Sequence, residues 1–112
     1  PGVKLNEVGK AIQGFADKNG YSLVTNLASH GVGRSLHDEP AEIPTWWEPG
    51  DRRRIHEGLV FTIEPFLSLG ADWVEEGDDG WTLTPPGHEP TVQYEHTLVA
   101  TRRGPIILTL AA

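Results

Sequence analysis

The fold is decided by VFTIE at residues 60–64 and VQYEHTL at residues 92–98. Apolar and polar side chains alternate along both stretches, which is the period of a strand that buries one face. Phe61 and Ile63 therefore share the apolar face of the first stretch, and Glu64 lies on its polar face. Glu95 lies on the polar face of the second stretch. If both strands belong to one sheet, we expect Glu64 and Glu95 on the same side of it and close together.

One helix and several further strands surround these stretches. Apolar residues recur at steps of three and four between Leu5 and Lys18, and Asn19-Gly20 follows as a stop signal, so we predict one amphipathic helix there. Strands are expected at 21–26, 59–69, 81–84, 91–101 and 105–110, separated by glycine- and proline-rich turns. This order predicts an α+β fold, an antiparallel sheet with one main helix on one face. The other face would be free for a site.

Two segments are predicted to be irregular. SHGVGR at residues 29–34 is rich in glycine, and we expect a tight loop there. Residues 39–50 contain three prolines and the pair Trp46-Trp47. The prolines exclude a central strand or a long helix, so we expect an irregular excursion whose tryptophans cap the core or line a cleft.

The composition limits the classes of protein to consider. The chain has 112 residues, 9 Lys+Arg against 16 Asp+Glu and no cysteine, which indicates one small acidic domain. The charge balance is acidic and the one basic run, Arg52-Arg53-Arg54, stands alone, which argues against nucleic acid as a partner. The lack of cysteine excludes disulfides and thiol chemistry. No apolar stretch is long enough to span a membrane, so we expect a soluble protein. Because the chain starts at Pro1 without an initiator methionine, we expect a processed product or a piece of a longer protein.

Two neighbouring carboxylates require either a proton or a cation. A divalent metal ion is the common cation, and His30, expected in the glycine-rich turn, would add a nitrogen ligand to the oxygens of Glu64 and Glu95. The alternative, which the pattern alone favours, is that both glutamates are solvated on the wet face of a half-exposed sheet. His37, as well as His56 and His88, reads as an ordinary loop histidine.

Four motifs in this order resemble the type I methionine aminopeptidases. They are HGVGR at 30–34 followed by HDEP at 37–40, FTIEP at 61–65, DGW at 79–81 and QYEHT at 93–97. The helical segment at residues 1–22 also resembles the family, so the resemblance covers nearly the whole chain. It implies that residues 1–112 form the C-terminal half of a pita-bread (creatinase/aminopeptidase) catalytic domain, with a curved antiparallel sheet. The resemblance also favours a metal site at Glu64 and Glu95 over the alternative that both glutamates are solvated.

The resemblance implies a metal centre. His30, Glu64 and Glu95 would bind a divalent ion, with Glu95 bridging to a second one, and Glu64 would also act as general base. The ion would be Co, Mn, Fe, Zn or Ni, with two ions in a complete site of the family and at most one expected here. The implied activity is that of a cytoplasmic hydrolase that removes N-terminal methionine from nascent polypeptides during protein maturation.

The resemblance also implies how the substrate is bound. His37 matches the histidine that hydrogen-bonds the scissile peptide group, and Trp81 matches a residue lining the pocket for the methionine side chain. Leu36 stands where many members carry an aromatic residue of the same pocket, and Ser29 replaces the usual glycine before His30. The shape of the pocket is therefore expected to differ from that of most members.

Part of the family's site has no counterpart in this sequence. Its two aspartate ligands and a further catalytic histidine lie in an N-terminal half that precedes the matched region. We therefore predict weak metal binding and little or no activity for this chain alone, and an apolar surface that the N-terminal half or self-association covers. Two alternatives stay open: a pita-bread peptidase of the Xaa-Pro or creatinase type, and a non-catalytic binding module that kept the half-fold.

Overall fold

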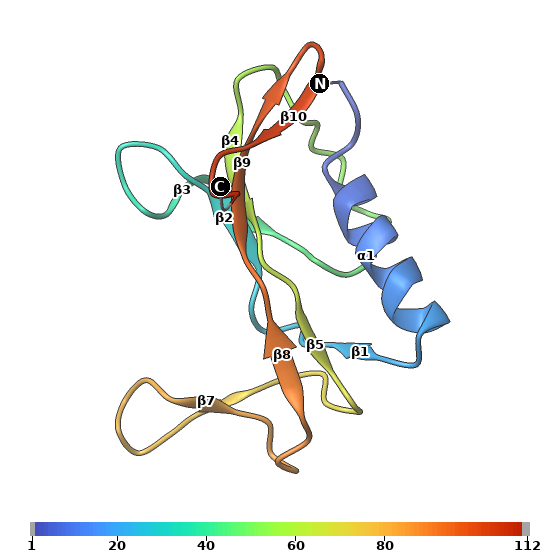
Figure 1. The fold of residues 1–112 in the computed structure, drawn as a ribbon, viewed down its shortest axis with the longest axis vertical. Helices are drawn as coiled ribbons and strands as arrows, with labels where there is room; N and C mark the ends of the chain where they lie inside the picture. The colour runs from blue at the N-terminus through green and yellow to red at the C-terminus, as the bar shows by residue number, and fades with distance from the viewer. Residues whose placement is uncertain (1, 111–112) are drawn as a thin grey trace.

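A computed structural model of the chain describes residues 2–110, which form one helix and ten strands (Figure 1). The elements in chain order are α1 (Asn6–Lys18), β1 (Ser22–Leu23), β2 (Ser29–Gly31), β3 (Asp38–Ile43), β4 (Val60–Ile63), β5 (Phe66–Ser68), β6 (Glu75–Glu76), β7 (Leu83–Thr84), β8 (Thr91–Gln93), β9 (His96–Thr101) and β10 (Gly104–Ile107). Within residues 2–110, α1 is neither long nor apolar enough to cross a membrane.

The strands pair in antiparallel fashion in three sheets within the described residues. The largest has the order β10-β9-β4-β2-β3, a second has the order β1-β5-β8, and β6 and β7 form a hairpin. In Figure 1, two neighbouring segments of the chain run through both larger sheets: β4 continues into β5 in one segment, and β8 continues into β9 in the other. The two larger sheets therefore follow one another along the molecule.

The predicted amphipathic helix is confirmed as α1, which lies on one side of the five-stranded sheet (Figure 1). Leu5, just before α1, forms a buried cluster with Phe61 and Leu98 of the sheet, and Val8 of α1 packs against this cluster. The β2–β3 loop and the β6–β7 hairpin project on the opposite side of the molecule (Figure 1). These two projections frame the face that α1 does not cover.

The two stretches that decide the fold are paired as predicted, but each is interrupted at its glutamate. β4 pairs with β9 in a register that joins Thr62 to Thr97 and Ile63 to His96. The next position in this register would pair Glu64 with Glu95, and both residues lie outside the strands. Because Pro65 has no N–H to donate, a continuous ladder through residues 59–69 is not possible. The single strands predicted at 59–69 and 91–101 are therefore two strands each.

Residues 29–31 form strand β2 inside the five-stranded sheet, so the prediction of a tight loop at 29–34 is wrong for these residues. Gly31 pairs with Asp38 of β3 on one side and with Phe61 of β4 on the other. A Cβ atom at Gly31 would overlap the carbonyl oxygen of Glu39. The glycine therefore permits close approach of two strands rather than a turn, and composition alone does not distinguish these uses.

Residues 38–43 form strand β3, which corrects the prediction of an irregular segment at 39–50. β3 is an edge strand, where Pro40 is tolerated because an outward-facing N–H is not needed for pairing. The Glu39–Pro40 peptide bond is cis. Residues 44–50 are irregular as predicted, and within them Trp47 lies beneath the ammonium group of Lys10, 5.3 Å from the ring centroid.

The β6–β7 hairpin contains a further strand, β6, that the sequence analysis missed. Glu75 and Glu76 of β6 are exposed and pair with Thr84 and Leu83 of β7. A strand of two adjacent glutamates has neither alternation nor β propensity, so it gives no signal in the sequence.

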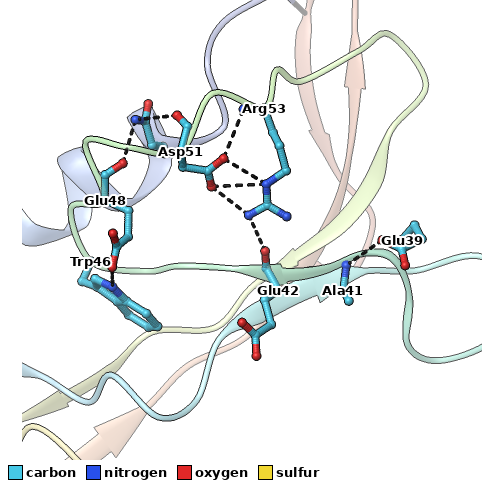
Figure 2. Close-up of polar contacts among 8 residues, drawn as sticks. Glu39, Ala41, Glu42, Trp46, Glu48, Asp51 and Arg53 are labelled. Atoms are coloured by element: carbon cyan, nitrogen blue, oxygen red, sulfur yellow. Dashed lines mark hydrogen bonds and ion pairs between the residues drawn. The ribbon is translucent and has the colours of Figure 1, made fainter.

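Polar contacts tie the irregular segment after β3 to the rest of the fold (Figure 2). Arg53 donates from Nε to Oδ1 of Asp51 at 3.0 Å and from Nη2 to Oδ2 at 2.7 Å, and its Nη2 also donates to the carbonyl of Glu42 in β3 at 2.6 Å. The buried amide of Asn6 donates to the carbonyls of Glu48 and Asp51 at 2.9 and 3.0 Å. The segment is therefore held both by the first turn of α1 and by the edge strand.

We expect Arg53→Lys to lower the free energy of unfolding by about 1 kcal/mol, because lysine cannot bind two carboxylate oxygens and a carbonyl through one planar group. The hydrogen bonds from Arg53 hold the pKa of Asp51 below its usual value. This stabilisation is therefore present at neutral pH and is lost as the pH falls through the lowered pKa. Urea unfolding of both proteins at neutral pH and near pH 2 measures it. A deficit of the same size at both pH values would contradict the ion pair as its source.

Candidate metal centre

Three side chains converge where β2, β4 and β9 lie next to one another. His30 is the middle residue of β2, Glu64 directly follows β4, and Glu95 directly precedes β9. One ligand atom of each residue lies within 4.8 Å of those of the other two. These are the three residues for which the sequence predicts one open site, and the tertiary structure brings them together.

The three side chains differ in exposure. The His30 side chain is 6% exposed and that of Glu64 is 15% exposed, whereas Glu95 is exposed. Glu64 is therefore not a solvated residue on a wet sheet face, and Glu95 forms the solvent-facing side of the cluster.

The hydrogen bonding of His30 leaves a lone pair directed at Glu64. Its Nδ1 lies 2.8 Å from the carbonyl oxygen of Gly31, and a carbonyl only accepts, so Nδ1 carries the proton and donates. In the neutral ring Nε2 is then an acceptor, and it lies 3.2 Å from Oε2 of Glu64. That oxygen is buried and has no hydrogen-bond donor. Two acceptors facing each other in this way need a cation or an additional proton between them.

The electrostatics of Glu64 indicate the same need for positive charge. Burial raises the pKa of the Glu64 carboxyl above its ordinary value, and the charge of Glu95 raises it further, while the Thr62 hydroxyl and His30 act in the opposite direction. One imidazole nitrogen and two carboxylates suit divalent ions such as Zn, Co, Mn and Fe. Histidine ligands also commonly donate their second ring N–H to a backbone carbonyl, as His30 does. The residues present therefore fit a divalent metal ion.

His37 lies directly beside the cluster. Its ring stacks on that of His30, with 3.9 Å between the centroids and 28° between the planes. The residue is exposed in the β2–β3 loop, so its ring is accessible to a molecule bound at the cluster. Only the family resemblance gave a signal for a position of His37 next to the cluster.

The other residues with an expected role lie on the two projections that frame this face. Leu36 is in the β2–β3 loop and is 72% exposed, and Trp81 is in the β6–β7 hairpin and is 83% exposed. Neither belongs to the three-residue cluster. His56 and His88 are exposed in connecting segments outside it.

Sequence reasoning missed two buried hydroxyl groups next to the cluster. Ser29 is 0% and Thr62 is 1% exposed. Each contacts the backbone of a residue of the cluster, Ser29 that of Glu64 and Thr62 that of His30. The strand alternation placed Thr62 on the polar face, but no feature of the sequence indicates these partners.

Two apolar hollows lie apart from the cluster. One, of about 430 Å³, lies between α1 and the five-stranded sheet and is lined by Val8, Ile63 and Pro105 among others. The other, of about 440 Å³, is lined by Phe15 of α1 and Val92 of β8 among others. Both are on apolar surfaces and neither is formed by the metal-site residues.

Comparison with known proteins gives a family match. The model of metallopeptidase family M24 matches residues 1–102. The chain is 38% identical over 109 residues to the methionine aminopeptidase of Staphylococcus epidermidis and 39% identical over 108 residues to methionine aminopeptidase 2 of Bacillus subtilis. These alignments cover 97% and 96% of this chain but 43% of each relative. The chain therefore spans less than half the length of these relatives.

Solved structures agree with this match. The chain superposes on the methionine aminopeptidase of Thermotoga maritima with a TM-score of 0.92 at 34% identity, and on that of Rickettsia prowazekii with a TM-score of 0.90 at 39% identity. The superpositions cover 99% and 98% of this chain and 44% of each of the other two. The predicted α+β, pita-bread type of fold, with antiparallel sheets and one main helix, is thereby confirmed.

Proposed function

Because the chain belongs to metallopeptidase family M24, we propose that it forms the C-terminal half of the catalytic domain of a methionine aminopeptidase. The whole protein would remove N-terminal methionine from nascent polypeptides. The observation that carries the proposal is the cluster of His30, Glu64 and Glu95, with a buried carboxylate oxygen that has no donor. The names of the relatives support the substrate.

His30, Glu64 and Glu95 are the residues that would hold the metal ion, which we propose to be Co, Mn, Fe, Zn or Ni. When bound, such an ion supplies Lewis acidity toward a carbonyl group and toward water. His30 contributes the free electron pair of Nε2, because its Nδ1 proton is engaged by the Gly31 carbonyl. Glu95, the exposed member, would contact a second ion.

Glu64 would accept a proton during the reaction, and His37 would bind the substrate. Glu64 faces Nε2 of His30 within the cluster, and its carboxylate would take a proton from the attacking water. His37 is exposed and stacked on His30, and it would donate a hydrogen bond to the scissile peptide group.

Leu36 and Trp81 would line the pocket for the methionine side chain. Both are strongly exposed and apolar, and they lie on the β2–β3 loop and the β6–β7 hairpin, which project on the same side of the molecule (Figure 1). A thioether side chain gains affinity from contact with aromatic and aliphatic surface.

We propose that this chain acts together with the part of the relatives that it does not span. Three donor side chains fill only part of a metal ion's coordination shell, so the chain alone would bind metal weakly and have little or no activity. The hollow of about 430 Å³ between α1 and the sheet and the exposed Ile106 and Leu108 near the sheet edge offer apolar surface for such a partner segment.

The proposal is tested by release of methionine from a Met-Ala-Ser peptide in the presence of Co²⁺ or Mn²⁺. The chain is assayed alone and after mixing with the part of the Bacillus subtilis relative that it does not span. We expect release in the mixture and little or none from either part alone, because the ligand set is complete only in the mixture.

An Xaa-Pro peptide is the matched control substrate. Cleavage of this peptide in place of Met-Ala-Ser would show a pita-bread peptidase of the Xaa-Pro type. A mixture that forms a stable complex but cleaves neither peptide would favour the non-catalytic binding module.

A further inference from the structure

At the metal site, side-chain hydroxyls rather than a regular ladder join β2, which contains His30, to the end of β4, which Glu64 directly follows. The register between β2 and β4 pairs Gly31 with Phe61. On the other side of β2, the register with β3 shifts between Ser29 and Gly31, so His30 lies at an irregularity of that pairing. The backbone at His30 therefore needs other partners.

Two fully buried hydroxyls supply these partners in a reciprocal way. The backbone N–H of His30 donates to Oγ1 of Thr62 at 3.0 Å, and Thr62 lies two residues before Glu64. The backbone N–H of Glu64 donates to Oγ of Ser29 at 3.0 Å, and Ser29 directly precedes His30. Ser29, next to His30, therefore accepts from the backbone of Glu64, and Thr62, close to Glu64, accepts from the backbone of His30.

This arrangement fixes the distance between the two ligands. His30 is buried, so its backbone N–H must keep an acceptor, and a shift of β2 against β4 would break both this bond and the bond from the N–H of Glu64 to Ser29. Both hydroxyls accept from the backbone N–H groups of the two ligands, and Nε2 of His30 and Oε2 of Glu64 lie 3.2 Å apart.

We propose that Ser29 and Thr62 are positioning residues that set the separation of the metal ligands His30 and Glu64 by clamping the backbone of each to the opposite strand. The proposal deepens the proposed function and rests on it, because it assumes that the two side chains bind one ion. It is independent of which ion that is.

Removing either hydroxyl is expected to weaken metal binding. We expect Ser29→Ala and Thr62→Val to raise the dissociation constant for Co²⁺, measured by calorimetry on the full chain, by about tenfold, since partners that orient metal ligands are typically worth 10- to 100-fold. Amide hydrogen exchange provides a second readout without metal. Ser29→Ala should accelerate exchange of the Glu64 amide, and Thr62→Val that of the His30 amide.

Two controls separate positioning from general destabilisation. Ser68→Ala removes a hydroxyl that is 2% exposed and bonded within the other sheet, so it should lower thermal stability without changing the Co²⁺ dissociation constant. Thr62→Ser keeps the hydroxyl but loses a buried methyl group, so it should retain the metal affinity that Thr62→Val loses.

The outcomes distinguish this proposal from the proposed function. If the unsubstituted chain does not bind Co²⁺, the metal centre is overturned and the positioning role falls with it. If the chain binds Co²⁺ and Ser29→Ala binds it equally well, or if Ser68→Ala weakens binding as much, only the positioning role is overturned. Unchanged exchange of the Glu64 amide in Ser29→Ala would also overturn it.

Discussion

Glu64→Gln is expected to weaken Co²⁺ binding by at least about 100-fold while leaving the metal-free chain as stable as before or more stable. Losing a group that merely orients a ligand typically costs about 10- to 100-fold in affinity. The loss here should be larger, because the anionic ligand itself is replaced by a neutral amide. The amide has nearly the shape of the carboxylate, so packing is preserved. Only the charge that faces His30 and Glu95 is lost.

The stability of the metal-free chain follows from the direction of the pKa shift. Burial, with Glu95 nearby, raises the folded-state pKa of Glu64 above its ordinary value. Between these two pKa values the folded state holds more protons than the unfolded state, so the free energy of unfolding falls as the pH rises through this interval. Glu64→Gln has no carboxyl group to titrate at this position, so the free energy of unfolding of the substituted protein should depend less on pH in this interval.

Calorimetric titration with Co²⁺ and urea unfolding between about pH 4 and neutral pH measure both effects. Glu75→Gln is the matched control, because Glu75 is exposed on the β6–β7 hairpin and outside the cluster. It should change neither quantity appreciably. Unchanged Co²⁺ affinity in Glu64→Gln would remove Glu64 from the site, and a large loss of metal-free stability would indicate a structural role for the carboxylate.

Gly9→Ala is expected to lower the free energy of unfolding by about 3 kcal/mol, although alanine is the best helix former. Gly9 is the fourth residue of α1 and is buried. A Cβ atom there would overlap the carbonyl oxygen of Trp46 and crowd that of Pro44. Because these are backbone atoms of a segment that is held by Asn6 and Arg53, they cannot move aside without breaking the contacts of that segment (Figure 2).

Gly14→Ala provides the matched control on the same helix. A Cβ atom at Gly14 would meet nothing within 4 Å, so alanine should show its usual advantage of about 0.5–1 kcal/mol. Urea unfolding of the two variants against the unsubstituted chain measures the contrast. If both substitutions stabilise the chain, the close approach of α1 to the segment at 44–46 is not present in solution.

The sequence alone predicted those features that depend on neighbours along the chain. The apolar spacing from Leu5 to Lys18 predicted α1, because the helical period is local. The alternation around Glu64 and Glu95 predicted that both glutamates share a sheet face, and the register of β4 and β9 agrees. The order of the four motifs predicted the family, which the family match confirms.

Only the tertiary structure decided how these parts meet. Glycine content suggested a loop around His30, yet hydrogen bonds to strands distant in sequence make residues 29–31 part of the sheet. The stacking of His37 on His30 and the two hydroxyl bonds at Ser29 and Thr62 likewise join residues from different elements. Such contacts depend on strand pairing and burial, which bring together residues far apart in the chain. The local pattern therefore determined which residues could carry a metal site, and the packing of β2 against β4 determined that His30 and Glu64 face each other.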